Sequence, residues 1–392
     1  MRKREYDFWL LFTVIMLLAM GTIMVFSASS YNALYYQGNK YYYLVRQLLW
    51  VTIGLIAMFI FSRIDYRRVA ESSPILMAIS IVLLVLVLVP HIGSNVNGAW
   101  RWFNFGSFSF QPSEFAKLAL IFFLSFSLSK NSDRLKHFFS GLLPYLLVIG
   151  VIDALLYLEP HMSAIILITL VSIIILFCAG AKVRHFIAMA VPVGLVGWKA
   201  VMGDEYRVER LISFMDPFKY AQEGGFQVVN SLYAIASGSL FGRGLGKSLQ
   251  KYLYIPEPQN DFIFPILAEE LGFIGAATVV VLFLLFIWRG MRVAMNAPDM
   301  MGSLMAAGIT SLVAAEAIIN IAVVTSTIPT TGMPLPFFSY GGSSMVFLLI
   351  SMGILLNISK GSSSVIRMLP DGREAQKGKH ILTTKKAGDY DL

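Results

Sequence analysis

The chain has 392 residues, of which 57% are hydrophobic and only 14% are charged, whereas a soluble globular protein carries about 25% charged residues. With a mean hydropathy of +0.69, the composition excludes a soluble multidomain protein and predicts one embedded in a bilayer. The net charge of +8 does not indicate nucleic-acid binding, because the basic residues are spread over loops and a tail, as membrane topology requires.

Apolar runs long enough to cross a bilayer, at about 20 residues per helix, occur ten times. We therefore expect an all-α polytopic membrane protein with about ten transmembrane helices. The first run is interpreted as a retained span, because it is longer than the apolar core of a signal peptide, about 7–15 residues. The spans are predicted at 8–29, 44–62, 74–90, 113–129, 138–158, 163–180, 185–202, 262–288, 301–324 and 341–359.

Lys and Arg cluster before span one, after spans two, four, six and eight, and in the tail, whereas the connections 159–162 and 325–340 contain none. The positive-inside rule therefore predicts that both termini are cytoplasmic. The basic residues that carry this argument are Arg2, Lys3, Arg4, Arg63, Arg67, Arg68, Lys130, Arg134, Lys136, Lys182, Arg184, Arg289, Arg292, Lys360, Arg367, Arg373, Lys377, Lys379, Lys385 and Lys386.

The predicted organisation is one membrane domain, 1–359, followed by a polar cytoplasmic tail, 360–392, that we expect to be disordered. Between spans seven and eight lies an external loop, 203–261, far longer than the usual connection of about 4–6 residues. Its aromatic content is too high for disorder, and its stretch 225–236 could form a short amphipathic helix on the membrane. The external segment 91–112 is rich in Gly, Asn and aromatic residues.

Ionisable residues inside spans cost roughly 2.5–3.5 kcal/mol each, so each needs a reason. Glu114 and Lys117 lie three residues apart on one helix face, which suits either a structural ion pair or the wall of a substrate cavity. Glu269 and Glu270 point about 100° apart on a helix, so at most one should face a given cavity; interhelical hydrogen bonding is the alternative. Asn320, four residues after Glu316, is expected to join helices by hydrogen bonding.

Two prolines, Pro256 and Pro258, precede Asp261 at the start of span eight. Asp261 could be a helix N-cap or a reactive carboxylate at the mouth of an external cavity. The Pro- and Gly-rich stretch 331–344 predicts a non-helical re-entry, which membranes tolerate only against protein or a watery cavity. The stretch 242–248 is one residue short of a phosphate-binding loop, so we expect no nucleotide cofactor.

These motifs together resemble the SEDS family (shape, elongation, division, sporulation), which includes FtsW, RodA and SpoVE. The resemblance covers all ten spans, and 245–251 favours the FtsW and SpoVE branch. It is carried by Asn97-Gly98-Ala99-Trp100-Arg101-Trp102, Gln111-Pro112-Ser113-Glu114 with Lys117, Gly242 to Gly246, Pro256 to Phe264 with Glu269-Glu270-Leu271-Gly272, and Pro329 to Ser344.

The resemblance implies a glycosyltransferase of the bacterial plasma membrane that polymerises lipid II on the external side. The 4-hydroxyl of one lipid II would attack the anomeric carbon of the growing chain, and undecaprenyl diphosphate would leave. The family's catalytic aspartate falls on Asp261. Many members carry Gln-Pro-Asp after span five, whereas this chain has Glu159-Pro160-His161, so the role of that acid cannot be transferred to His161.

The implied reaction needs a base for the hydroxyl and positive charge for the diphosphate. At a helix N-terminus Asp261 should be ionised but weakly basic. An ionised carboxylate also repels the diphosphate, so we expect Mg²⁺, Mn²⁺ or nearby cations to assist. Arg210 is a further external cation. The candidate substrate-binding residues are Arg101, Glu114, Lys117, Arg207, Arg243, Lys247, Lys251, Glu269, Ser339 and Ser343.

The resemblance also implies partners: a class B penicillin-binding transpeptidase and other membrane proteins of division or sporulation, with no nucleic acid. Two alternatives remain open. A lipid II flippase would use the intramembrane charges as a passage, although transporter sites usually lie at the bilayer midplane. A scaffold that only recruits the transpeptidase would tolerate substitution of Asp261.

Overall fold

The computed structural model describes residues 6–96, 98–106, 108–252 and 254–366. Arg2, Lys3 and Arg4, Asn97 of the family motif, and 367–392 of the predicted tail lie outside the described residues. The helices are α1 (Phe8–Gln37), α2 (Tyr42–Phe61), α3 (Tyr66–Glu71), α4 (Ser73–Val87), α5 (Pro112–Asn131), α6 (Leu143–Leu158), α7 (Met162–Cys178), α8 (Val183–Met202), α9 (Glu205–Met215), α10 (Phe226–Ser237), α11 (Ile263–Met295), α12 (Met300–Val324) and α13 (Gly342–Ile366).

Each predicted span coincides with one of these helices, and within the described residues seven are long and apolar enough to cross a membrane. These are α1, α2, α5, α6 with its preceding turn, α11, α12 and α13, while α4 and α7 are shorter apolar helices. The last span was predicted to end at 359, but α13 continues to Ile366, so part of the predicted tail is helical.

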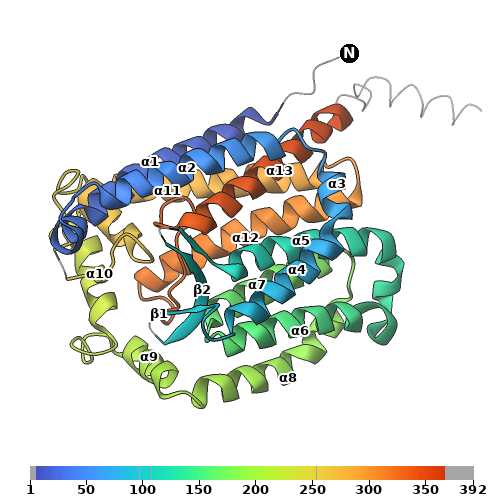
Figure 1. The fold of residues 1–392 in the computed structure, drawn as a ribbon, viewed down its shortest axis with the longest axis horizontal. Helices are drawn as coiled ribbons and strands as arrows, with labels where there is room; N and C mark the ends of the chain where they lie inside the picture. The colour runs from blue at the N-terminus through green and yellow to red at the C-terminus, as the bar shows by residue number, and fades with distance from the viewer. Residues whose placement is uncertain (1–5, 97, 107, 253, 367–392) are drawn as a thin grey trace, which may run out of the picture.

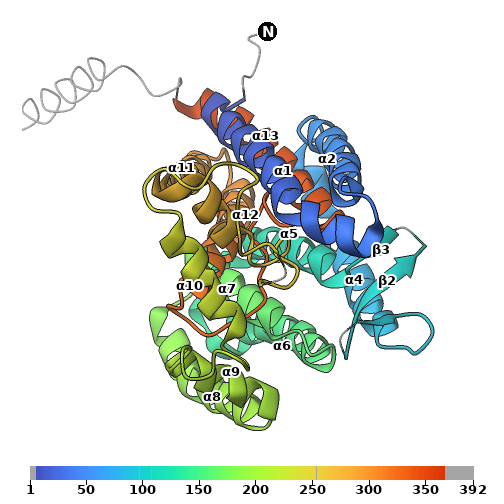
Figure 2. The same ribbon diagram turned by 90° about the vertical axis from the view of Figure 1, so that its left-hand side faces the viewer.

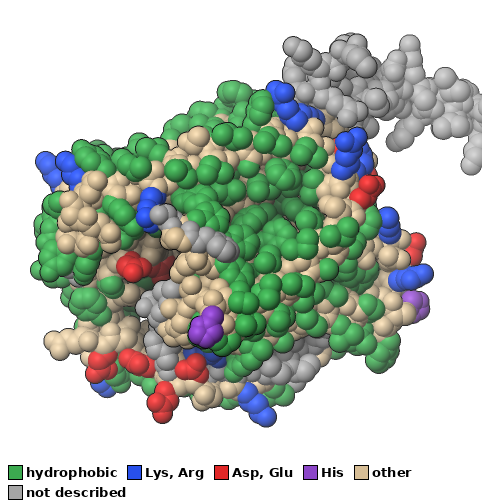
Figure 3. Space-filling model, viewed as in Figure 1, with side chains coloured by type: hydrophobic (Ala, Val, Ile, Leu, Met, Phe, Trp, Pro, Cys, Tyr) green, Lys and Arg blue, Asp and Glu red, His purple; other side chains and the backbone are tan. Residues whose placement is uncertain are grey.

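Most helices run side by side between two ends of a bundle (Figure 1). We call the end with the strands, α9 and α10 the site end, and the end with the start of α1, α3 and the end of α13 the terminal end. The surface between the ends is largely apolar, and basic side chains gather at the terminal end (Figure 3). This distribution is the one that a bilayer-spanning protein requires.

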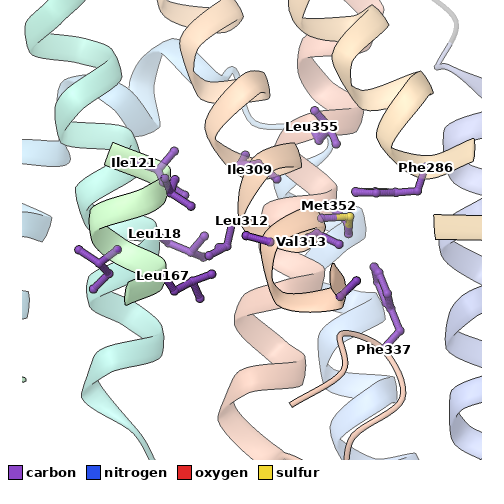
Figure 4. Close-up of a cluster of buried hydrophobic side chains, with 14 of the residues drawn as sticks. Leu118, Ile121, Leu167, Phe286, Ile309, Leu312, Val313, Phe337, Met352 and Leu355 are labelled. Atoms are coloured by element: carbon purple, nitrogen blue, oxygen red, sulfur yellow. The ribbon is translucent and has the colours of Figure 1, made fainter. Parts of the chain in front are cut away.

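The core of the bundle is built around α12, which packs against α11, α7, α5 and α13. Figure 4 shows Leu312 and Val313 of α12 between side chains from α5 and α7 on one side and from α13 and α11 on the other. Phe337, from the loop that precedes α13, reaches the same core and packs 6.2 Å from the ring of Phe286, measured between centroids. The connection between α12 and α13 is therefore anchored inside the bundle.

The all-α prediction omitted a small antiparallel sheet within 91–112, in the order β1–β2–β3. Its strands are β1 (Ser94–Val96), β2 (Ala99–Phe105) and β3 (Phe108–Phe110). Aromatic residues favour strands, and the glycines at positive φ, Gly98 and Gly106, lie between consecutive strands, where tight turns need that conformation. The sheet carries Arg101 to the site end.

Helix α11 is broken at Gly272, whose φ and ψ are 68° and −169°. A Cβ at this position would lie 2.3 Å from the backbone nitrogen of Gly242 and 2.5 Å from the carbonyl oxygen of Leu240, so the close approach requires glycine. The loop that follows α10 fills the break, and its Arg243 and Gly244 amides donate to the carbonyls of Glu269 and Glu270 at 2.9 and 3.0 Å.

The long connection 203–261 contains α9 and α10, which flank the site end of the bundle (Figure 2). Helix α10 occupies the stretch for which the sequence suggests a short helix. It packs against α11 and α12, while α8 and α9 lie at the periphery (Figures 1 and 2). Helix α10 is thus held against the bundle, while several aromatic side chains of this connection, among them Phe218, Tyr233 and Phe241, stay exposed.

Candidate active site

Asp261 lies in the turn immediately before α11, at the site end. The N-cap residue of α11 is Phe262, which makes no side-chain cap bond, and the Asp261 carboxylate interacts instead with its own backbone amide. The N-cap alternative is therefore wrong. The side chain remains partly accessible to solvent, as a group that meets a substrate must be.

The backbone of this turn is fixed at three successive carbonyl groups. Tyr340 donates its amide to the carbonyl of Gln259 at 2.8 Å, and Ser339 donates its hydroxyl to the carbonyl of Asn260 at 2.6 Å. Asn320 of α12 donates its side-chain amide to the carbonyl of Asp261 at 2.7 Å. Because these donors come from α12 and the loop before α13, tertiary contacts position Asp261 more firmly than its own helix does.

The loop 325–341 runs directly past the Asp261 carboxylate. At Gly332, which has a φ of +67°, an added Cβ would lie 3.6 Å from Oδ2 of Asp261. Arg210 of α9 donates to the carbonyl of Thr330 at 3.1 Å, and Ser163 of α7 donates to the carbonyl of Thr331. The loop predicted as a non-helical re-entry thus joins α7, α9, α11 and α12 around one carboxylate.

Burial raises the pKa of Asp261 above its ordinary value, and Glu257 acts in the same direction. The positive charge of Arg210 acts against this rise. This corrects the prediction of a weakly basic carboxylate. Loss of hydration raises the pKa by more than the backbone hydrogen bond and Arg210 lower it. A raised pKa makes the ionised carboxylate a better proton acceptor.

Arg101 on β2 binds the turn between α6 and α7. Its guanidinium donates to the carbonyl of Glu159 at 3.1 Å and to the carbonyl of Pro160. Burial raises the pKa of Glu159 to about 8, with Arg101 opposing. Burial, assisted by the charges of Arg101 and Lys117, lowers the pKa of His161 to about 3. His161 is therefore neutral near pH 7 and supplies no charge in place of the family's acid.

Both carboxylate oxygens of Glu159 and Nδ1 of His161 are buried without a hydrogen-bond partner among the described residues. Unpaired buried polar groups reduce the stability of the folded protein. Costs of this kind cluster at functional sites, and this turn lies just before Ser163, which bonds the loop beside Asp261. The sequence identified the unusual turn but not its burial.

Glu114, Lys117 and Glu316 form one buried charge cluster below the loop. Nζ of Lys117 lies 2.9 Å from Oε1 of Glu114 and 2.6 Å from Oε1 of Glu316. The cluster lines a cavity of about 40 Å³ together with loop residues that include Ser339. Glu114 and Lys117 are thus ion-paired, as one alternative held, and both also line this cavity. That the cavity receives substrate, the other alternative, stays a prediction.

Glu269 and Glu270 both bind the loop 243–251, and the bond from Ser27 of α1 to Glu270 is the interhelical hydrogen bonding that the sequence offered as an alternative. Glu269 accepts from the Leu249 amide at 2.9 Å, and Glu270 accepts from Lys251 Nζ at 3.0 Å and from the hydroxyl of Ser27. Both face it because 243–251 wraps around two sides of α11. Lys251 and Glu269 are almost fully buried, so a direct substrate contact would require these bonds to open.

The remaining candidates are spread over the site end. Arg243 and Lys247 are exposed on the loop, with Arg243 Nη1 lying 3.8 Å from Glu269 Oε1. Arg207 pairs with Asp204 at 3.1 Å, and Ser343 accepts from the Gln111 amide at 3.2 Å. Among the predicted residues, Ser339 bonds the turn that contains Asp261, and Arg210 bonds the loop that passes its carboxylate.

The sequence did not single out Ser163 or Gly332. For Asn320 it predicted hydrogen bonding between helices, without naming the partners. A signal for Ser163 exists in its position just after the unusual turn 159–161, at the start of α7. Within the described ranges, no group of three or more His, Cys, Asp or Glu side chains is placed to hold a metal ion. The side chains near Asp261 thus do not fit a metal site made by the protein alone.

The chain matches the profile of the family described as "Cell cycle protein" (FtsW/RodA/SpoVE) over residues 8–364. It is 43% identical to Stage V sporulation protein E of Bacillus subtilis (strain 168), covering 92% of this chain and 99% of that protein. It is 42% identical to the probable peptidoglycan glycosyltransferase FtsW of Geobacter sp. (strain M18), covering 92% and 98%.

Solved structures show the same fold. A structure described as "Structural coordination of polymerization and crosslinking by a peptidoglycan synthase complex" contains a chain that matches with a TM-score of 0.77 and 28% identity, covering 91% of this chain and 98% of that one. The rod shape determining protein RodA of Thermus thermophilus matches with a TM-score of 0.67 and 26% identity, covering 91% and 97%.

Proposed function

Because the chain belongs to the FtsW/RodA/SpoVE family, we propose that it is a peptidoglycan glycosyltransferase that polymerises glycan strands from lipid II. It is a multi-pass membrane protein. The observation that carries the proposal is the turn at Asp261, whose three successive carbonyls are held by Tyr340, Ser339 and Asn320. Such over-determined backbone is what a precisely placed catalytic group needs.

In the proposed reaction, the Asp261 carboxylate accepts the proton of the 4-hydroxyl of an incoming lipid II. The hydroxyl oxygen then forms the new bond to the anomeric carbon of the growing chain, and the bond from that carbon to undecaprenyl diphosphate breaks. The leaving group departs with the electron pair. A positioned base of this kind contributes about 10²–10⁴ in rate.

Positive charge for the departing diphosphate comes, in this proposal, from Arg210. It is close enough to act on the pKa of Asp261 and is held by the carbonyl of Thr330. Arg243 and Lys247, both exposed on the same end of the molecule, are the next candidates. Substrate contacts of Arg101, Arg207, Glu114, Lys117, Ser339 and Ser343 remain predictions, as does assistance by Mg²⁺ or Mn²⁺, which removal of divalent cations with EDTA would test.

The orientation follows from the same proposal. Lipid II polymerisation outside the membrane requires the site end to face outward, and both termini then lie in the cytoplasm, as the basic residues of the terminal end favour. A class B penicillin-binding transpeptidase and other membrane proteins of division or sporulation are the proposed partners. The synthase complex whose chain shares this fold supports the first of these.

The test is polymerisation of labelled lipid II by the purified full chain with its transpeptidase, comparing wild type with Asp261→Asn. Glu205→Gln is the matched control, because Glu205 is an exposed acid in the first turn of α9. We expect glycan strands from wild type and Glu205→Gln and none from Asp261→Asn. Equal polymerisation by Asp261→Asn would remove Asp261 from the mechanism.

Absence of strands from the intact, activated wild-type complex would instead favour the flippase. A normal cellular growth phenotype of Asp261→Asn, with the complex intact, would favour the scaffold.

A further inference from the structure

A cavity of about 350 Å³ lies at the terminal end of the bundle, on the opposite end from Asp261. The connection between α2 and α3 and the end of α13 supply its lining, with Pro298 from the connection before α12. Asn357 of α13 fixes its shape, because its side chain donates to the carbonyl of Ser62 at 2.9 Å and accepts from the amide of Tyr66 at 3.1 Å. The cavity is therefore a built feature of three packed segments.

The acidic side chains beside this cavity already have partners. Asp299 accepts from Nη2 of Arg67 at 2.6 Å and from the hydroxyl of Tyr66 at 2.8 Å, and it caps α12 through the amide of Gly302. Asp65 caps α3 through the amide of Arg67 and lies 3.7 Å from its guanidinium. The charge of Arg67 is thus compensated within the protein.

Two further cations line the cavity without a carboxylate partner among the described residues: Arg63 and Lys360. The guanidinium of Arg63 lies over the ring of Phe59, 4.1 Å from its centroid. Nζ of Lys360 lies 4.2 Å from the ring centroid of Tyr6 and donates to the carbonyl of Ser62 at 2.9 Å. Arg63 and Lys360 keep donors for an anion, and phosphate oxygens are the acceptors that such cations favour.

The surface next to the cavity indicates which phosphate compound fits. Along α2, in the two turns before Arg63, the side chains of Ile56, Phe59 and Ile60 are 57%, 55% and 48% exposed. An apolar helix face that continues from a basic cavity at the end of spanning helices suits a headgroup above two acyl chains. A soluble phosphate compound would leave that face unused.

We propose that this cavity binds the phosphate headgroup of an anionic phospholipid, with Arg63 and Lys360 contacting the phosphate and the acyl chains lying along α2. The site is separate from Asp261 and does not depend on the reaction catalysed there. It would hold the ends of α2 and α13 together at the membrane surface.

Native mass spectrometry of the full chain in detergent, titrated with phosphatidylglycerol, tests the proposal. The variants are Arg63→Gln, Lys360→Gln and their combination, and the matched control is Arg68→Gln, because Arg68 is exposed at the end of α3 and does not line the cavity. Each single variant removes about one ionic contact. We therefore expect the affinity for phosphatidylglycerol to fall about fivefold for each single variant and about 30-fold for the combination. Arg68→Gln should change it less than about twofold, and Arg63→Lys should retain binding if Arg63→Gln fails to fold.

Unchanged binding in the combined variant would overturn the proposal, and so would an equal loss in Arg68→Gln, which would indicate diffuse surface attraction. Equal binding of phosphatidylcholine would remove the requirement for an anionic headgroup. Full displacement of the lipid by millimolar inorganic phosphate would assign the cavity to a soluble phosphate compound instead.

Discussion

The side-chain amide of Asn320, in α12, donates a 2.7 Å hydrogen bond to the backbone carbonyl of Asp261, in the turn before α11. The same amide group donates to the carbonyl of Met333 at 2.7 Å. One side chain thus ties the proposed catalytic turn to the loop that passes its carboxylate. Asn320 itself is buried, so water cannot replace these bonds without rearrangement.

We expect Asn320→Ala to reduce polymerisation by about 10²-fold, because a displacement of about 1 Å at a reacting group has an effect of that size. The two carbonyls left unpaired should also destabilise the protein, at about 1–3 kcal/mol each. Polymerisation rate and thermal unfolding are measured together. Thr325→Ala, at the exposed end of the same helix, is the control, and an equal loss of activity in it would contradict a specific role for Asn320.

The pH dependence of polymerisation should report the raised pKa of Asp261. Only the ionised carboxylate can accept a proton, so the rate should fall as the pH drops through a pKa above the ordinary 3.8. Arg210→Gln removes a charge that lowers this pKa, so it should move the acid limb of the profile of kcat/KM to higher pH. Arg210→Lys should move it back, and an unmoved limb in Arg210→Gln would contradict the electrostatic contact.

Substitutions in the buried charge cluster should have unequal effects on stability. Lys117→Met leaves Glu114 and Glu316 without their shared cation, and breaking a buried ion pair in this way costs about 3–5 kcal/mol. Glu114→Gln leaves the pair of Lys117 and Glu316, at 2.6 Å, intact and neutral overall. Thermal unfolding in detergent should therefore show a large loss for Lys117→Met and a small change for Glu114→Gln; the reverse order would contradict the proposed charge balance.

Stability should fall as the pH rises through the pKa of Glu159. Burial raises that pKa from 4.5 to about 8, so the folded protein holds a proton that the unfolded chain releases. The resulting stabilisation is fully present below about pH 4.5 and is lost progressively up to about pH 8. Glu159→Gln cannot titrate, so its melting temperature should exceed that of wild type at pH 9 and depend less on pH. Parallel curves for the two proteins would contradict a buried neutral Glu159.

Sequence reasoning was strongest where one physical rule governs a long stretch. A bilayer demands about 20 apolar residues per spanning helix, and each stretch predicted on that basis coincides with a helix. It was weaker in 91–112, where aromatic residues and turn glycines form strands that hydropathy does not detect. The break at Gly272 was also invisible, because an apolar helix with one glycine looks continuous until Gly242 is seen against it.

The sequence by itself determined that this chain is a membrane protein, that Asp261 follows two prolines and precedes a helix, and that its motifs resemble the SEDS family, because composition and local spacing are properties of the chain alone. Only the tertiary structure decided what surrounds Asp261. The donors that fix its turn lie 59 to 81 residues from their acceptors in the chain, and the pKa of its carboxylate is raised by burial, beside the loop at Gly332. Packing of the loop 243–251 against α11 also decided that Lys251 is buried beside Glu270, because a buried charge is stable only beside its partner.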